Sequence, residues 1–289
     1  MTTSRLVALA ALLLILGASA DAQAPETQRV VLVDGTVLVG TVDDASADPV
    51  VVRSRSGVEQ RVRRADIAEI LPLIEGRFTR TDPTRTRTIL SPTGRTLGGG
   101  TKRLATAIYV IPNASVGVTD RLDLSGTALV SVGSGSGGVI PALGAKFGIV
   151  DTGSFAAAVG ATVVFPLSGD SDVNGSFIAT PYVAATVGSE VRSLTLGLTG
   201  VVGGDVTSGD AEVGQGALLQ LGGHHQLSNS VALVGEVAVP LVEGGSGVGV
   251  LPGVRVFGDK FSVDVYGVLG VADGGFGGFA PLANFAYTF

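Results

Sequence analysis

The chain has 289 residues, a formal net charge of −6, and neither cysteine nor tryptophan. The lack of cysteine excludes disulfide bonds and thiolate metal sites. No basic stripe with interleaved aromatic residues is present, so we expect no nucleic acid partner. The mean hydropathy is +0.49. The 44 glycines disfavour helices, and the abundant Val and Thr favour strands, so the composition predicts an all-β protein.

Residues 1–24 have the pattern of a secretory signal peptide. Arg5 precedes an apolar run from Leu6 to about Gly17, and small residues follow, so cleavage is expected after residue 20, 22 or 24. The run is shorter than the roughly 20 apolar residues that a membrane-spanning helix needs. No later run reaches that length. We therefore expect an exported chain that is either soluble or held in a membrane by its own fold.

Residues 26–73 are predicted to form a small β domain. Asp34-Gly35 joins two short apolar runs and is a strong hairpin signal. Further short runs follow at 49–55, 58–64 and 67–73, and the whole pattern resembles the small SH3-like or Sm-like barrels. The alternative is a pair of hairpins packed on whatever follows. Residues 74–83 are interpreted as a linker, because Gly76 and Pro83 interrupt any period.

From residue 84 to residue 289 the chain is predicted to form an antiparallel up-and-down β-barrel that crosses a membrane. Apolar and polar residues alternate over 176–188, 193–200 and 261–271. Short polar connections alternate with longer Gly-rich ones, which is typical of barrels with tight periplasmic turns and larger outer loops. Taking 84–97 as the first strand and 279–289 as the last gives about 12 strands. The alternative is a soluble all-β protein.

The chain ends on three aromatic residues at alternate positions, Phe285, Tyr287 and Phe289. This ending resembles the β-signal that the barrel-assembly machinery recognises in bacterial outer-membrane proteins. Residues 118–126 also resemble a recurrent turn in poorly characterised outer-membrane barrels. The likeness covers residues 84–289. It implies a bacterial outer-membrane location, with membrane lipid as a partner and the N-terminal domain in the periplasm, but no defined activity.

The two predicted regions differ in charge. Residues 26–103 contain 13 basic and 10 acidic residues, whereas residues 104–289 contain 5 and 14. In the first region, five arginines lie on or beside the predicted strands: Arg53, Arg55, Arg61, Arg63 and Arg64. They are expected to form a basic surface that contacts the anionic inner leaflet or the cell wall, or else a solvated strand face.

Five charged residues fall on the polar faces of predicted barrel strands: Asp123, Lys146, Glu236, Arg255 and Asp264. A Lys or Arg that faced lipid near the midplane would cost about 2–4 kcal/mol, so these side chains are expected to point into the lumen. There they either pair and plug the barrel or line a narrow water-filled pore.

Two further motifs suggest sites only weakly. Asp170, Asp172 and Asn174 have the spacing of the first half of a calcium loop, but Pro181 stands where a bidentate Glu belongs, so a solvated acidic loop is the alternative. His224 and His225 lie near Ser228 and Ser230, as a His–Ser hydrolase would require.

The sequence therefore predicts a non-enzymatic outer-membrane barrel without a cofactor, acting as a structural protein or as a narrow passive pore for small solutes. The alternatives are an outer-membrane lipid hydrolase or deacylase that uses a His and a Ser, and a soluble secreted β-protein that binds a partner.

Overall fold

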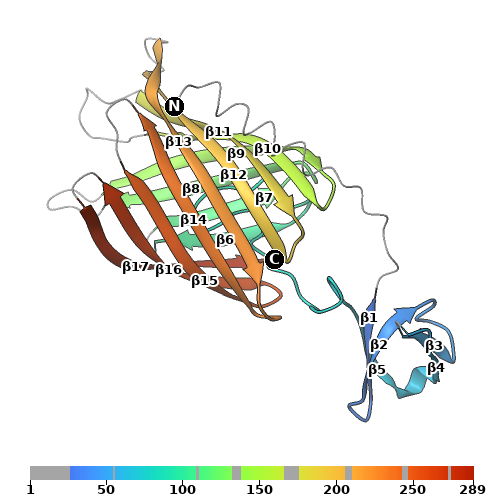
Figure 1. Ribbon diagram of the computed structural model, residues 1–289. Coiled ribbons are helices and arrows are strands. Elements are labelled where there is room, and N and C mark those ends of the chain that lie inside the picture. Colours follow the sequence, from blue (N-terminus) through green and yellow to red (C-terminus); the bar gives the residue numbers. More distant parts are fainter. Residues whose placement is uncertain are drawn as a thin grey trace. The chain divides into compact units, whose positions relative to one another are not determined.

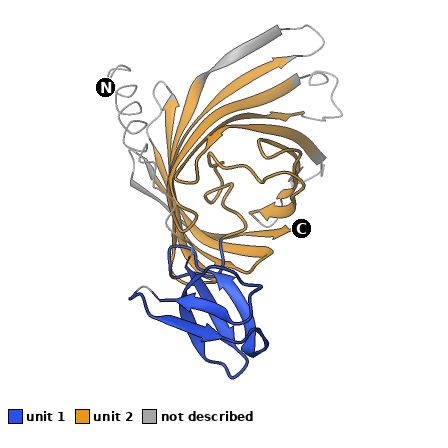
Figure 2. Cartoon of the chain, turned by 90° about the vertical axis from the view of Figure 1, so that its right-hand side faces the viewer, with its two compact units in different colours: residues 1–81 blue, residues 82–289 orange. Residues whose placement is uncertain are grey.

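The computed structural model describes residues 27–54, 56–108, 111–131, 138–165, 176–205, 210–242, 247–272 and 275–289. The chain divides into two compact units, residues 1–81 and 82–289 (Figure 2). The predicted signal peptide lies outside the described residues. Within them the fold is all-β, as predicted, and no helix is long and apolar enough to cross a bilayer.

The first unit is a five-stranded antiparallel sheet with the strand order β4-β3-β2-β1-β5. The predicted hairpin at Asp34-Gly35 is present, with Gly35 at φ 87°, a left-handed conformation that favours glycine. Val30, Val50, Val52 and Ile67 form the core. The elements of the unit are β1 (Gln28–Leu32), β2 (Val37–Val42), β3 (Val50–Arg53), β4 (Glu59–Val62), the 3₁₀ turn η1 (Arg64–Asp66) and β5 (Ile67–Pro72).

The second unit is a closed antiparallel barrel of twelve strands in sequence order (Figure 1). The chain closes the barrel where the last strand pairs with the first. The strands are β6 (Lys102–Ala107), β7 (Ile111–Gly117), β8 (Leu122–Ser131), β9 (Gly138–Asp151), β10 (Phe155–Val164), β11 (Ser176–Gly188), β12 (Arg192–Asp205), β13 (Asp210–Gln226), β14 (Val231–Val242), β15 (Val248–Phe257), β16 (Phe261–Ala272) and β17 (Gly275–Thr288).

The strand count agrees with the prediction, but one assignment behind it is wrong. Residues 84–97 form no barrel strand; they contain one isolated bridge, between Arg87 and Pro92. The first strands are instead β6 and β7, so two strands precede the tight turn at residues 118–121. The physical reason lies in the pattern of residues 84–88, where Thr alternates with Arg. A strand of this kind has no apolar face, whereas the barrel strands expose apolar residues on the outside.

The barrel strands turn apolar side chains outward and polar side chains inward. Leu194 and Leu198 of β12 are exposed on the outside, whereas Thr195 between them is buried. In β16, Val265 is exposed while Ser262 and Asp264 are buried. Both faces were predicted from the alternation. Every barrel strand except β7 contributes large exposed apolar residues: Leu104, Leu124, Leu143, Val159, Val183, Leu194, Leu221, Leu233, Val254, Val265 and Phe285 among them.

The predicted tight turns are also present, and they lie at one end of the barrel because the strands run alternately up and down. They connect β7 to β8, β9 to β10, β11 to β12, β13 to β14 and β15 to β16. The C-terminal end of β17 lies at this end too. There Phe289 donates its backbone N–H to the Lys102 carbonyl at 2.8 Å, and the Tyr287 and Phe289 rings meet edge to face with centroids 4.9 Å apart. Phe285, Tyr287 and Phe289 are all exposed.

Candidate functional site in the barrel interior

The barrel interior is occupied by a segment of the same chain, residues 82–97, which we call the plug. Figure 2 shows an irregular stretch of chain inside the ring of strands. Alternate plug residues are almost completely buried: Asp82, Thr84, Thr86, Thr88, Ser91, Thr93, Arg95 and Leu97, with Ile89 between them. The segment is therefore enclosed by the wall and does not form part of it.

The plug fits because it is mostly polar and approaches the wall closely. A Cβ atom at Gly94 would collide with the backbone carbonyl of Ala156 in β10, and one at Gly222 of β13 would collide with the Thr88 side chain. Glycine is therefore needed on the plug at one contact and on the wall at the other. Ile89 is the apolar residue of the plug that packs on Val234, Leu251 and Tyr266.

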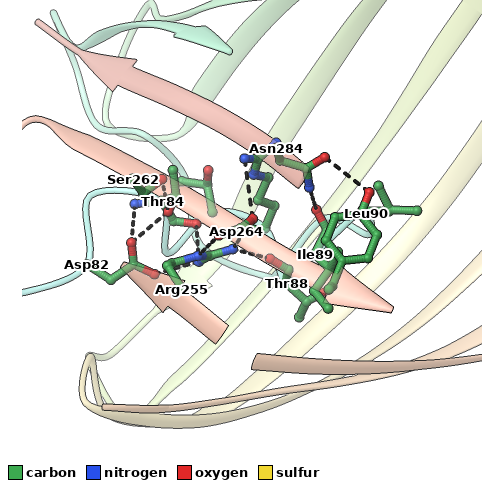
Figure 3. A network of polar contacts seen from close by, with 12 residues as sticks. Asp82, Thr84, Thr88, Ile89, Leu90, Arg255, Ser262, Asp264 and Asn284 are labelled. Carbon is green, nitrogen blue, oxygen red and sulfur yellow. Dashed lines mark hydrogen bonds and ion pairs between the residues drawn. The ribbon is translucent and has the colours of Figure 1, made fainter. Parts of the chain in front are cut away.

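Arg255 of β15 is the centre of the largest polar cluster (Figure 3). Its guanidinium lies between two carboxylates, with Nε 2.5 Å from Asp264 Oδ1 and Nη1 2.5 Å from Asp82 Oδ2. Nη2 also donates to the Thr88 carbonyl. Arg255 is 1% exposed and both carboxylates are fully buried. One wall residue thus links the neighbouring strand β16 to both ends of the first half of the plug.

Glu236 of β14 holds the middle of the plug by accepting a set of hydrogen bonds. Its Oε2 accepts the backbone N–H groups of Ile89, Leu90 and Ser91 at 3.0–3.3 Å and the Thr88 hydroxyl at 2.7 Å. Its Oε1 accepts the Ser91 hydroxyl at 2.5 Å. Successive N–H groups that converge on one carboxylate satisfy donors that would otherwise be buried without a partner. Asn284 of β17 also contacts this part of the plug and donates to the Ile89 carbonyl at 3.1 Å.

Asp123 and Lys146 hold further main-chain groups of the plug, in both of its halves. Both oxygens of Asp123 accept the Leu97 N–H at 3.1 Å, and Lys146 donates to the carbonyls of Thr86 and Arg95. The two residues are opposite each other on β8 and β9. Each of them nevertheless makes its closest polar contacts to the plug backbone.

All five charged residues that were assigned to the lumen are thus buried in the interior, and all five contact the plug. Their pairing differs from the simple expectation of charges that neutralise one another across the lumen. Among the five, the structure gives an ion pair only between Arg255 and Asp264. The remaining contacts run to main-chain groups of the plug and to plug side chains, namely Asp82, Arg87 and the hydroxyl groups of Thr88 and Ser91.

Sequence reasoning missed the plug side of these contacts. Asp82 was interpreted as part of a linker and Arg95 as part of a strand, yet Asp82 pairs with Arg255, and Arg95 donates to the carbonyls of Gly153 and Gly188 at 2.7 Å. Gly153 lies in the tight turn between β9 and β10, and Gly188 is the last residue of β11 before the next tight turn. Arg95 therefore lies toward the end of the barrel where the tight turns are. The available signal was the lack of any apolar face in residues 84–88.

The two histidines lie on opposite faces of β13. His225 is exposed, whereas the His224 side chain is 10% exposed and its Nε2 lies 3.5 Å from Asp82 Oδ2. The structure therefore places His224 beside a plug carboxylate. Ser228 and Ser230 lie in the following tight turn, where the Ser228 hydroxyl accepts the Ser230 N–H. The calcium-loop candidates Asp170, Asp172 and Asn174 lie outside the described residues, and no cluster of three metal-ligating side chains occurs within them.

A cavity of about 400 Å³ lies between the plug and the wall. Leu90, Ser91 and Pro92 of the plug form part of its lining. About half of the wall residues that line it have hydroxyl or amide side chains, such as Asn113, Ser125, Thr162, Thr180, Thr199 and Gln220. The interior is thus partly filled by the plug and partly hollow.

No protein-family model and no curated protein matches this sequence. The class of the protein therefore follows from its geometry: it is a closed twelve-stranded antiparallel β-barrel whose polar interior contains a segment of its own chain, preceded by a separate five-stranded sheet.

Proposed function

We propose that this protein is a non-enzymatic barrel of the bacterial outer membrane, closed by its own plug, with the five-stranded unit in the periplasm. The observation that carries the proposal is the inverted distribution of polarity. Leu143, Val183 and Val265 are more than half exposed on the outside, while charged residues such as Arg255 and Asp264 are buried inside. Soluble monomers rarely expose a continuous apolar surface of this extent, whereas lipid covers it in a membrane barrel.

The plug favours a structural barrel over an open pore. It is attached to the wall by buried ion pairs and by hydrogen bonds to main-chain groups, and these contacts come from strands all around the barrel, including β8, β9, β11, β14, β15 and β17. A loosely held segment would leave buried donors and acceptors unpaired, at a cost of about 1–3 kcal/mol for each group. The closed state is therefore the stable one in this proposal.

The proposal includes the SH3-like fold of the first unit, its basic surface and the recognition of the last strand during assembly. The strand order of the first unit, with five short strands joined consecutively and the first paired to the last, supports the SH3-like interpretation.

The basic surface of the first unit is partly neutralised, because Arg53 pairs with Asp43 and Glu59, and Arg63 pairs with Asp66. Contact with the inner leaflet or cell wall therefore depends chiefly on the remaining arginines. Recognition of β17 by the barrel-assembly machinery is likewise proposed.

Fractionation of cells that express the full chain tests this proposal. We expect the protein in the outer-membrane fraction after a urea wash that removes peripheral proteins. On a gel in dodecyl sulfate we expect it to migrate differently before and after boiling, because a closed barrel resists the detergent until it is heated. Recovery in the soluble periplasmic fraction, without a change of mobility on heating, would contradict the proposal and support a secreted β-protein.

A further inference from the structure

The cavity beside the plug has an unbalanced charge. Its lining includes three cationic side chains, Arg87, Arg103 and Lys146, and one carboxylate, Asp123. The carboxylate is already engaged by the Leu97 N–H. Within the described residues, no carboxylate lies within ion-pair distance of Arg103 or Lys146, and the nearest carboxylate oxygen to Arg87 is Asp264 Oδ2 at 3.6 Å. The cavity therefore carries an excess of positive charge.

The two guanidinium groups also have unused hydrogen-bonding capacity. Nε and Nη2 of Arg87 and Nε of Arg103 are buried without a hydrogen-bond acceptor. Within the described residues, the one hydrogen bond of the Arg103 side chain runs from Nη1 to the Thr86 hydroxyl at 2.5 Å. Buried cationic groups without a partner are costly. An oxyanion is the group that matches guanidinium donors best, because its oxygens accept their N–H groups in pairs.

The rest of the wall determines what such an anion would carry. The side chains of Asn113, Ser125, Thr162, Thr180, Tyr182 and Gln220 line the cavity and offer hydroxyl and amide groups of both donor and acceptor character. This lining suits a ligand with several hydroxyl groups. The volume of about 400 Å³ lies within the range of small-molecule sites, roughly 300–1,000 Å³.

We propose that this cavity binds a small hydroxylated anion, of the size of a monosaccharide that carries a phosphate or sulfate group. Arg103 and Arg87 contact the anionic group, and the hydroxyl and amide side chains of the wall contact the sugar-like part. The site is formed by the folded barrel and its plug alone, so it goes beyond the membrane proposal and does not depend on it.

Isothermal titration calorimetry on the full chain, folded in detergent, tests this site with glucose 6-phosphate, glucose and inorganic phosphate as probes. We expect glucose 6-phosphate to bind, inorganic phosphate to bind more weakly, and glucose to give no heat. Arg103→Gln should weaken glucose 6-phosphate binding about tenfold or more, because a charge-assisted hydrogen bond is lost. Arg103→Lys keeps the charge but lacks the paired N–H donors of a guanidinium, so it should retain only part of the affinity.

Arg85→Gln is the matched control. Arg85 is also a plug arginine, but it pairs with Glu190 and does not line the cavity, so its replacement should leave binding unchanged. The change of gel mobility on heating shows which variants are folded, and Arg87→Gln provides a second test if Arg103→Gln is not. Absence of binding by the unmodified chain, equal binding of glucose and glucose 6-phosphate, or equal weakening by Arg85→Gln would each overturn the proposal.

Discussion

Replacing Arg255 with methionine is expected to lower the free energy of unfolding by about 3–5 kcal/mol, the cost of removing one partner from a buried ion pair. Arg255 is the cation between Asp82 and Asp264, and all three side chains are almost completely inaccessible. Without it, the nearest basic side chains are Arg87, 3.6 Å from Asp264, and the imidazole of His224, 3.5 Å from Asp82. Urea unfolding followed by far-ultraviolet circular dichroism measures the loss.

Two controls distinguish this effect from a general sensitivity to substitution. Arg121→Met removes an exposed arginine in a tight turn and should change the free energy of unfolding by no more than about 0.5 kcal/mol. The triple variant Arg255→Met, Asp82→Asn and Asp264→Asn removes the charges together and should recover much of the lost stability. If Arg255→Met proved as mild as Arg121→Met, the buried cluster would not hold the plug.

Replacing residues 82–97 with a Gly/Ser sequence of equal length is expected to convert a silent barrel into a conducting one. The replacement removes the residues that meet Glu236, Arg255, Asp123 and Lys146 inside the barrel. A barrel of eight strands is filled by its own side chains, whereas one of 16–18 strands leaves an aqueous channel. Twelve strands lie between these cases, and here the plug occupies much of the interior.

Planar bilayers measure this change directly. We expect no resolved conductance steps with the full chain and discrete steps with the plug replacement. Glu236→Gln keeps the plug but weakens the charge-assisted contacts to Ile89, Leu90 and Ser91, so it should give only brief and infrequent openings. Equal conductance by the full chain and the plug replacement would contradict a closed barrel and would favour the narrow passive pore.

The sequence predicts the barrel itself well, because an apolar outer face and a polar interior impose a two-residue period on each strand. Leu194, Leu196 and Leu198 fall on one face and Thr195 and Thr199 on the other, and the structure keeps these faces. The tight turns can be predicted in the same way, since short polar connections lie between the alternating runs. These features depend on local sequence alone.

The plug was not predicted, because its position depends on contacts with distant strands. Alternating Thr and Arg at 84–88 satisfies the period of a strand, so periodicity alone favours the wrong assignment. The inward side of Glu236 or Lys146 follows from the cost of placing a charge in lipid. Their partners do not follow from it, because main-chain N–H and carbonyl groups of residues 86–97 carry no signal in the amino-acid pattern.

An engineered disulfide between the plug and the inner wall tests the central claim most directly. The hydroxyl oxygens of Thr84 and Ser262 lie 3.0 Å apart, close enough for the side chains of a disulfide, and the chain contains no cysteine of its own. Under mild oxidation the folded variant Thr84→Cys, Ser262→Cys should cross-link and migrate differently on a denaturing gel without reductant. The control Thr84→Cys, Val263→Cys, whose second cysteine points to the opposite face of β16, should not. Cross-linking of the control pair alone, or of neither pair, would contradict a plug inside the barrel.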